Sequence, residues 1–319
     1  MMKAFPARAR QMCLMITMFV TASGMFAQPR PLTRHFVASV EERYQVTLVL
    51  RAESHSVATE TVAAQTYATP VVHAAEVSLH WHADRRILSV QDDGSAAIEE
   101  TLVPASQQCE DAPPSEKTDA ALQLSLKTFC ASWLKAEIIR YAENNKGALR
   151  ETTATASENA LPPLAETAPP LLSLWLKRAV RPNVIFPQLP FEMGATSQHS
   201  FQPAGHLLKN ARGSETTEWL DAQGETPAAT LHVVQQLVWS ATPPATAVRI
   251  ESHESQTQKD ESFFADSVST VSLQDGSLLR ANRSASRTTS RHVDPVPGLP
   301  QPPEFSSKLT VTVTIERVP

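Results

Sequence analysis

The chain has 319 residues, with 28 Lys and Arg against 33 Asp and Glu, and its formal net charge is −5. This length is enough for one large domain or two modest domains with a real hydrophobic core. An acidic chain is a poor general binder of nucleic acid, because contact with phosphates needs a basic surface. Composition therefore excludes nucleic acid as a general partner, and an envelope partner or an apolar ligand stays possible.

Residues 1–27 have the pattern of a secretory signal peptide: a basic start, an apolar run of about ten residues and small residues at the end. The run is too short to span a bilayer, which needs about 20 apolar residues. We predict export through the general secretory route, with cleavage after Ala27 or after Gly24. Cys13 would leave with the signal peptide, and no other cysteine lies near the cut, so we expect no lipid anchor. The mature chain is expected to be soluble, periplasmic or secreted, with no membrane span.

The next segment, residues 28–149, is predicted to be an N-terminal lobe rich in strands. Apolar and polar residues alternate from Tyr44 to Arg51 and again from Val77 to His82, which is the period of half-buried strands. Asp93-Gly94 predicts a hairpin turn between two further short strands.

The pattern then changes to helical spacing. Apolar residues recur every three or four positions, which predicts one long amphipathic helix over about residues 119–143. Thr118 or Asp119 can cap the start of this helix, and the polar stretch Asn144–Gly147 predicts its end.

Residues 150–168 are rich in Thr, Ala, Glu and Pro, and they predict a linker or a long surface loop. A short helix is predicted over about residues 170–180, because it begins with prolines and Pro182 follows its end. The remainder of the C-terminal lobe, residues 169–319, returns to strands. These strands are predicted at residues 214–220, 230–239, 268–273, 277 onward and 308–316.

Together these elements predict an α+β protein dominated by antiparallel β-sheet, in which the strands form either two lobes or one curved sheet. The segment Ser89–Ser95 resembles Val271–Ser277, and both contain Asp-Gly-Ser. This likeness indicates either two related lobes or merely favourable turn chemistry. In architecture alone, strands wrapped near a helix in an exported protein resemble the half-barrels of lipoprotein carriers.

The glycines exclude several nucleotide-binding and hydrolase motifs. There are nine, and the two closest, Gly205 and Gly213, are eight positions apart. Phosphate loops, dinucleotide fingerprints and nucleophile elbows all need glycines five or fewer positions apart. We therefore expect no nucleotide cofactor, and the sequence indicates no cofactor of another kind.

Cys109 and Cys130 remain after the signal peptide is removed, and an even pair in an oxidising compartment predicts a disulfide. The alternative is two unpaired thiols, one in a loop and one on the apolar face of the helix. A metal site at this pair is disfavoured, because it lacks a third and a fourth ligand.

Two further groups are weak candidates for ligand binding. His80 and His82 lie two apart on a predicted strand and so share one face, where they could bind a metal with His73 as a third ligand, although surface histidines are the favoured interpretation. Four arginines would form an anion-binding stripe if they lay on a helix, but a strand paired with upstream acidic residues is favoured. These are Arg280, Arg283, Arg287 and Arg291.

No catalytic motif emerges from the sequence. The leading hypothesis is an exported, non-catalytic binding or envelope-associated protein, in its sharper form a carrier of a lipid or another apolar ligand. A carrier requires a concave sheet face lined by aliphatic and aromatic side chains and left partly uncovered by the helix. The alternative is a secreted hydrolase whose catalytic residues are scattered along the chain, which requires a polar cleft where ionisable groups from different strands meet.

Overall fold

A computed structural model describes ten segments of the chain. They are residues 31–62, 65–105, 109–112, 118–131, 137–151, 170–201, 212–221, 227–241, 257–293 and 305–319. The predicted signal peptide, all but the first two residues of the predicted linker and most of the proline-rich stretch at 293–303 lie outside the described residues.

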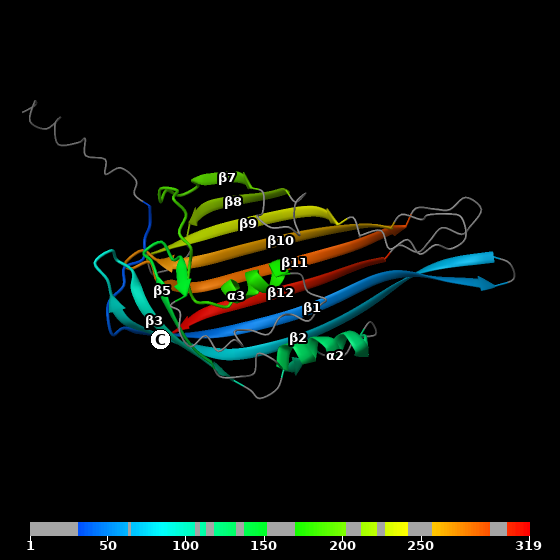
Figure 1. Cartoon of the computed structure of the whole chain (residues 1–319), viewed down its shortest axis with the longest axis horizontal. Helices are drawn as coiled ribbons and strands as arrows, with labels where there is room; N and C mark the ends of the chain where they lie inside the picture. The colour runs from blue at the N-terminus through cyan, green and yellow to red at the C-terminus, as the bar shows by residue number, and fades with distance from the viewer. Residues whose placement is uncertain are drawn as a thin grey trace, which may run out of the picture.

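Within the described residues, antiparallel strands form one 12-stranded sheet, in the order β6-β5-β3-β2-β1-β12-β11-β10-β9-β8-β7 (Figure 1). β4 pairs with β2 off this path. The first and last strands are neighbours near the middle of the sheet, where β1 and β12 pair from Arg43–Val318 to Ser56–Phe305. The strands are β1 (Glu41–Val62), β2 (Gln65–Val90), β3 (Ala96–Pro104), β4 (Glu110–Asp111), β5 (Glu137–Glu143), β6 (Leu149–Glu151), β7 (Thr196–Phe201), β8 (Arg212–Asp221), β9 (Ala228–Ala241), β10 (Thr257–Ser272), β11 (Leu278–Val293) and β12 (Phe305–Val318).

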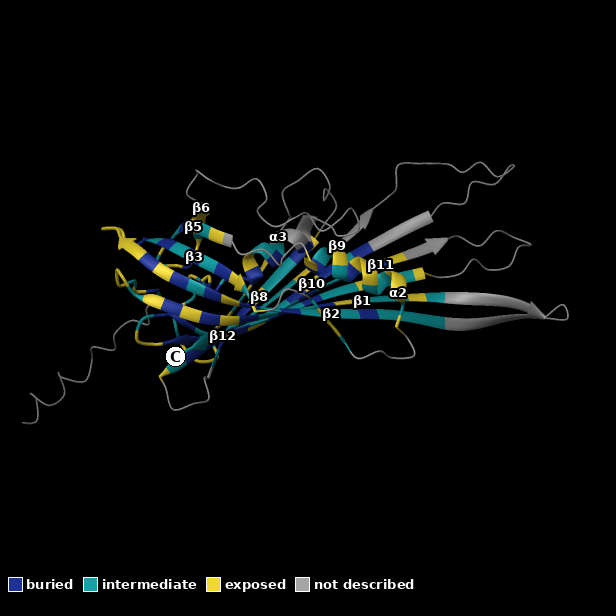
Figure 2. Cartoon of the chain, turned by 90° about the horizontal axis from the view of Figure 1, so that it is seen from below, coloured by how far each residue is buried: buried dark blue, intermediate teal, exposed yellow. Residues whose placement is uncertain are grey.

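The predicted β-rich α+β class is therefore confirmed, and of the two alternatives for the sheet the structure has one continuous sheet. The alternation that predicted the strands divides the sheet into an inner face, on which both helices pack, and an outer face. In β12, for example, Val311, Val313 and Ile315 are fully buried, whereas the threonines between them keep partial exposure. Figure 2 shows buried and exposed residues alternating along the strands.

The predicted long helix is wrong in its second half. Helix α2 covers Ala120–Ala131, and Glu137–Glu143 forms strand β5, which pairs with β3. The backbone of this segment forms hydrogen bonds with β3. Tyr141 and Glu143 are buried on the inner face, while Ile138 is exposed on the other face. Spacings of three and four residues around two isoleucines and a tyrosine did not distinguish a helix from a strand in this segment.

Of the two predicted ends of this helix, the start is confirmed and the end is wrong. Asp119 caps α2, because its Oδ1 accepts hydrogen bonds from the backbone N–H groups of Ala121 and Leu122, both at 2.9 Å. The polar stretch predicted to end the helix instead turns β5 into β6, with Gly147 at a φ of 79°. Asn144–Gly147 does form a turn, but the turn ends strand β5 and not the helix.

The second helix, α3, covers Pro170–Ala179, close to the predicted 170–180. Its buried side chains, Leu172, Leu176 and Ala179, belong to the same core as the inner face of the sheet. In the described part of the chain, no helix is long and apolar enough to cross a membrane.

The two Asp-Gly-Ser segments form the same turn at the β2–β3 and β10–β11 hairpins. In each, the aspartate Oδ1 accepts hydrogen bonds from the backbone N–H and the hydroxyl of the serine two residues later. Gly94 and Gly276 both take left-handed φ values, 78° and 69°, which favour glycine. Each hairpin also has a register shift close to its turn.

Residues 32–40 precede β1 and cross one end of the sheet; we call them the N-terminal arm. The backbone N–H of Arg34 donates to the carbonyl of Asn145 in the β5–β6 turn, and that of His35 donates to Asp275 in the β10–β11 turn, both at 2.8 Å. Four strands, β3, β2, β1 and β12, separate β5 from β11 in the sheet. The arm therefore connects two turns that are distant within the sheet.

Candidate functional site

The inner face of the sheet carries the apolar core of the protein and is the first candidate for a binding site. It is built from alternate residues of the central strands, because every second side chain of a strand points to the same face. Buried aliphatic and aromatic residues from β1, β2, β8, β9, β10, β11 and β12 join in one cluster. Representative members are Leu48, Leu79, Trp219, Leu231, Phe263, Ala285 and Val313.

Each helix covers a different part of this face. α2 packs on β2 and β1 and contributes Leu126 and Cys130 to the core, and α3 packs on β11 (Figure 1). Three apolar residues that pack against the core, Trp175, Val233 and Leu309, keep partial exposure. The helix that was expected over residues 119–143 would have covered more of the face than the shorter α2 does.

The predicted disulfide is present. The sulfur atoms of Cys109 and Cys130 are 1.94 Å apart, and the bond joins the segment before β4 to the last turn of α2. Cys130 is fully buried in the core. The bond therefore attaches α2 to the inner face of the sheet.

Arg283 of β11 attaches the second helix, α3, to the sheet. This residue of β11 is buried on the inner face, and its Nη1 donates to the carbonyls of Ala179 and Arg181 at 2.8 and 2.9 Å. Its Nη2 donates to the carbonyl of Asn183. These carbonyls lie at and just beyond the end of α3, where the helix dipole favours a positive charge. Burial lowers the pKa of Arg283 to about 10.

The second candidate is a buried network of three arginines and three glutamates near one end of the inner face. Arg34 pairs with Glu42, and Arg85 pairs with Glu143. Arg85 Nη1 also donates to Glu42 Oε2 at 3.2 Å. All four of these side chains are at most 3% exposed.

The remaining charged members of this network are Arg181 and Glu100, whose Nη1 and Oε1 atoms are 3.2 Å apart. Two buried tyrosines complete it: the Tyr44 hydroxyl donates to Glu42 at 3.1 Å, and the Tyr141 hydroxyl donates to Glu100 at 2.7 Å. We call these eight residues the buried charge network. It draws on the N-terminal arm, four strands and the segment after α3.

Burial shapes the titration of this network. Desolvation raises the pKa of Glu143, although Arg85 and Arg34 oppose the shift. Desolvation also raises the pKa values of Tyr44 and Tyr141, with nearby glutamates adding to the effect, so both tyrosines remain hydrogen-bond donors. For Arg85, burial alone would lower the pKa, but the surrounding tyrosines and glutamates raise it well above the usual value.

The network brings ionisable groups from different strands together, as a hydrolase would require, but not in a cleft. Its charged side chains are at most 14% exposed, and all six take part in direct ion pairs. A substrate would have to open the core to reach them. The arrangement is chemically suited to holding elements together.

The predicted metal ligands do not converge. His80 and His82 lie on the outer face, as the strand period predicts, and His82 is exposed. His73 lies an odd number of residues away and therefore on the inner face, where its Nδ1 is 3.2 Å from Asp119 Oδ2. Within the part of the chain that is described, no group of three or more His, Cys, Asp and Glu could hold a metal ion.

His80 instead takes part in a series of outer-face contacts. Its Nδ1 is 2.9 Å from the hydroxyl of Thr47 on β1, and its Nε2 is 3.7 Å from Glu110 Oε2 on β4. The sequence did not reveal this hydroxyl–imidazole–carboxylate series, because its members are distant along the chain.

The arginine stripe that helical spacing would have made does not form, because these residues lie on β11. Arg280 is exposed and pairs with Glu316 at 3.2 Å. Arg283 and Arg287 face inward, where Arg287 pairs with Glu261 at 2.7 Å. The side chain of Arg291 lies outside the described residues.

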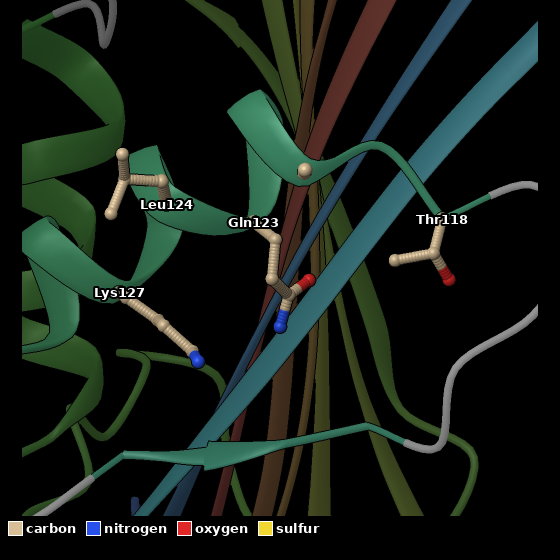
Figure 3. A pocket seen from close by; sticks show the side chains of 5 residues that line it. Thr118, Gln123, Leu124 and Lys127 are labelled. Carbon is tan, nitrogen blue, oxygen red and sulfur yellow. The ribbon is translucent and has the colours of Figure 1, made fainter.

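One surface hollow of about 480 Å³ lies beside α2. Figure 3 shows Gln123 and Lys127 extending from the helix on the same side, whereas Leu124 points elsewhere. The two polar side chains are already engaged, since Gln123 Nε2 and Lys127 Nζ both bond Asp111, at 2.7 and 2.6 Å. The hollow thus offers no free polar group from these two residues.

No protein-family model matches the chain, and no curated protein matches it. Function has to be inferred from the geometry described above.

Proposed function

We propose that this protein is exported and acts as a non-catalytic binding protein that holds an apolar ligand, such as a lipid acyl chain, against the inner face of its sheet. The observation that carries the proposal is the broad aliphatic and aromatic inner face, where Trp175, Val233 and Leu309 pack against the buried core and keep partial exposure. Aliphatic and aromatic protein surfaces bind apolar ligands through the apolar area that binding removes from water.

Two further observations support the proposal. The inner-face arginines Arg34, Arg85 and Arg287 lie in ion pairs, and Arg283 donates to backbone carbonyls, so these charges hold the fold together. The disulfide is typical of proteins that fold in an oxidising compartment, which agrees with export directed by residues 1–27.

The test compares two identical substitutions on one strand. Val233 and Val234 are neighbours on β9 that point to opposite faces, and both are partly exposed. We expect Val233→Asn on the inner face to weaken binding of the fluorescent probe N-phenyl-1-naphthylamine, and its displacement by a fatty acid, by about tenfold. Val234→Asn on the outer face should change neither by more than about twofold.

Native mass spectrometry provides an independent readout of ligand binding. It is applied to the mature protein isolated from the cell envelope of the organism that produces it. A retained mass that lipid extraction removes supports the proposal. If the wild-type protein binds no apolar probe and retains no such mass, or if both variants bind equally, the proposal is wrong.

A second candidate, a secreted hydrolase, is favoured by the contacts of His80. An imidazole between a hydroxyl and a carboxylate could accept the Thr47 proton while the hydroxyl oxygen attacks an ester carbonyl. The imidazolium would return the proton to the departing alcohol as the ester C–O bond breaks, and water would then hydrolyse the acyl-Thr47 ester. Covalent labelling of Thr47 by a fluorophosphonate probe, lost in His80→Ala, would support this candidate. Absence of labelling in the wild-type protein would reject it.

A further inference from the structure

We infer that the N-terminal arm is a strap that holds the curved sheet closed at one end and thereby limits access to its inner face. The part of this inference that concerns ligand access rests on the proposed function. The closure itself stands on the contacts of the arm.

The strap is attached at two distant places. Its backbone bonds to Asn145 and Asp275 connect the β5–β6 turn to the β10–β11 turn. Close packing supports the second attachment, because a Cβ at Gly276 would lie 2.6 Å from the carbonyl oxygen of Thr33. Movement of the arm would therefore release turns from both halves of the sheet.

Charge holds the strap in place between these turns. Arg34 is buried on Glu42, inside the buried charge network, and its guanidinium lies 5.3 Å from the ring centre of Phe36. An ion pair in the interior is strong only while both partners remain in place, because removing one leaves a buried charge without compensation. Removal of Arg34 should therefore release the arm.

Apolar contacts show what the strap covers. Phe36 and Val40 pack against a small cluster at this end of the sheet that contains Ile87 and Ile98. Ser39, with a φ of 67°, lies in a turn near the end of the arm, just before β1. If the arm left, this cluster would open to solvent and lengthen the accessible inner face.

Two variants loosen the strap by different means, and each has a matched control. Arg34→Met removes the buried charge. Its control is Arg43→Met, which removes an exposed arginine of β1 that pairs with Asp84 of β2. Gly276→Ala pushes on Thr33, and its control is Gly94→Ala. Gly94 occupies the same kind of turn with a similar positive φ, but a Cβ there would make only ordinary van der Waals contact, at 3.7 Å, with the side chain of Asn145 in the β5–β6 turn.

The readout is hydrogen exchange of the mature protein at neutral pH, measured by mass spectrometry. We expect Arg34→Met and Gly276→Ala each to speed exchange by about tenfold or more in both turns, Asn144–Gly147 and Leu273–Ser277. In Gly276→Ala, faster exchange in the distant Asn144–Gly147 turn is the decisive result, because only the arm would carry the effect of the substitution to that turn. The two control variants should leave that turn unchanged.

Separate outcomes decide the closure, the access and the proposed function. If Gly276→Ala affects the Asn144–Gly147 turn no more than Gly94→Ala does, the strap inference is overturned. If the two turns loosen but N-phenyl-1-naphthylamine does not associate faster than with the wild-type protein, the access part fails. If the turns loosen and no form of the protein binds the probe, the closure stands and the proposed function fails.

Discussion

Arg283 shows how one residue on a strand can position a helix. It is a buried cation whose described bonds go to backbone carbonyls at the end of α3 instead of to a carboxylate. Hydrogen bonds that involve a charged donor contribute more than neutral ones, and their carbonyl acceptors are left unsatisfied when the donor is removed.

We therefore expect Arg283→Met to lower the free energy of unfolding by about 3 kcal/mol, measured by denaturant titration. Arg280→Met is the control on the same strand, because Arg280 is exposed and pairs with Glu316 at the surface. The control should change stability by less than about 0.5 kcal/mol. Equal effects of the two substitutions would contradict the role given to Arg283.

Glu143 makes stability depend on pH in an unusual direction for a carboxylate. Its pKa is raised by burial, so in the pH range between the unfolded and folded pKa values the folded protein binds more protons than the unfolded chain. The contribution of Glu143 to stability is therefore fully present below the unfolded pKa and is lost as the pH rises through the folded one.

Glu143→Gln should remove this dependence. We expect the difference in unfolding free energy between the wild-type protein and this variant to fall with rising pH, by up to about 1.4 kcal/mol per pH unit within that range. Glu41→Gln, at an exposed position, serves as the control and should leave the pH profile unchanged. A difference that grows with pH would contradict the assignment.

Among the helices and strands, α2 is the one that the Cys109–Cys130 disulfide holds in place. It has 12 residues, few of them buried, and the Cys109–Cys130 disulfide closes a separation of 21 residues. Closing a loop of this length stabilises a fold by about 3 kcal/mol in the chain-entropy model.

Reduction should therefore lower the free energy of unfolding of the wild-type protein by about 3 kcal/mol and add the mass of two hydrogens. The double variant Cys109→Ser, Cys130→Ser should be destabilised to the same extent, and reductant should not affect it further. A wild-type protein whose stability and mass do not respond to reductant would show that the bond is absent in solution.

For the whole molecule, the central pairing of β1 with β12 has the largest consequence. The first and the last strand of the chain are neighbours in the sheet. The apolar core contains residues from both predicted lobes. A cut between the lobes should therefore leave them bound to each other.

This expectation is tested by inserting a protease site within the predicted linker, residues 150–168, and cleaving the folded protein. We expect both fragments to elute together in size-exclusion chromatography and to separate only in denaturant. Fragments that elute apart under native conditions, each still folded, would show that the two lobes are independent domains.

The sequence by itself determined most of the strands, the Asp-Gly-Ser turns, α3, the cap of α2 and the pairing of the two cysteines. These features depend on local alternation, on turn chemistry and on a count of two cysteines, all of which can be read along the chain. The sequence also held an unused signal, because Arg85 and Glu100 occupy strand positions whose neighbours on the same face are apolar.

Tertiary structure decided the rest. Residues 137–143 became a strand because the open edge of β3 offered backbone partners, which local spacing does not report. The buried charge network, the bonds of Arg283 to α3 and the route of the N-terminal arm join residues that are distant along the chain, such as Arg85 and Glu143, Arg283 and Ala179, and His35 and Asp275. Such contacts depend on the order of strands in the sheet, and that order is set by the packing of the whole core.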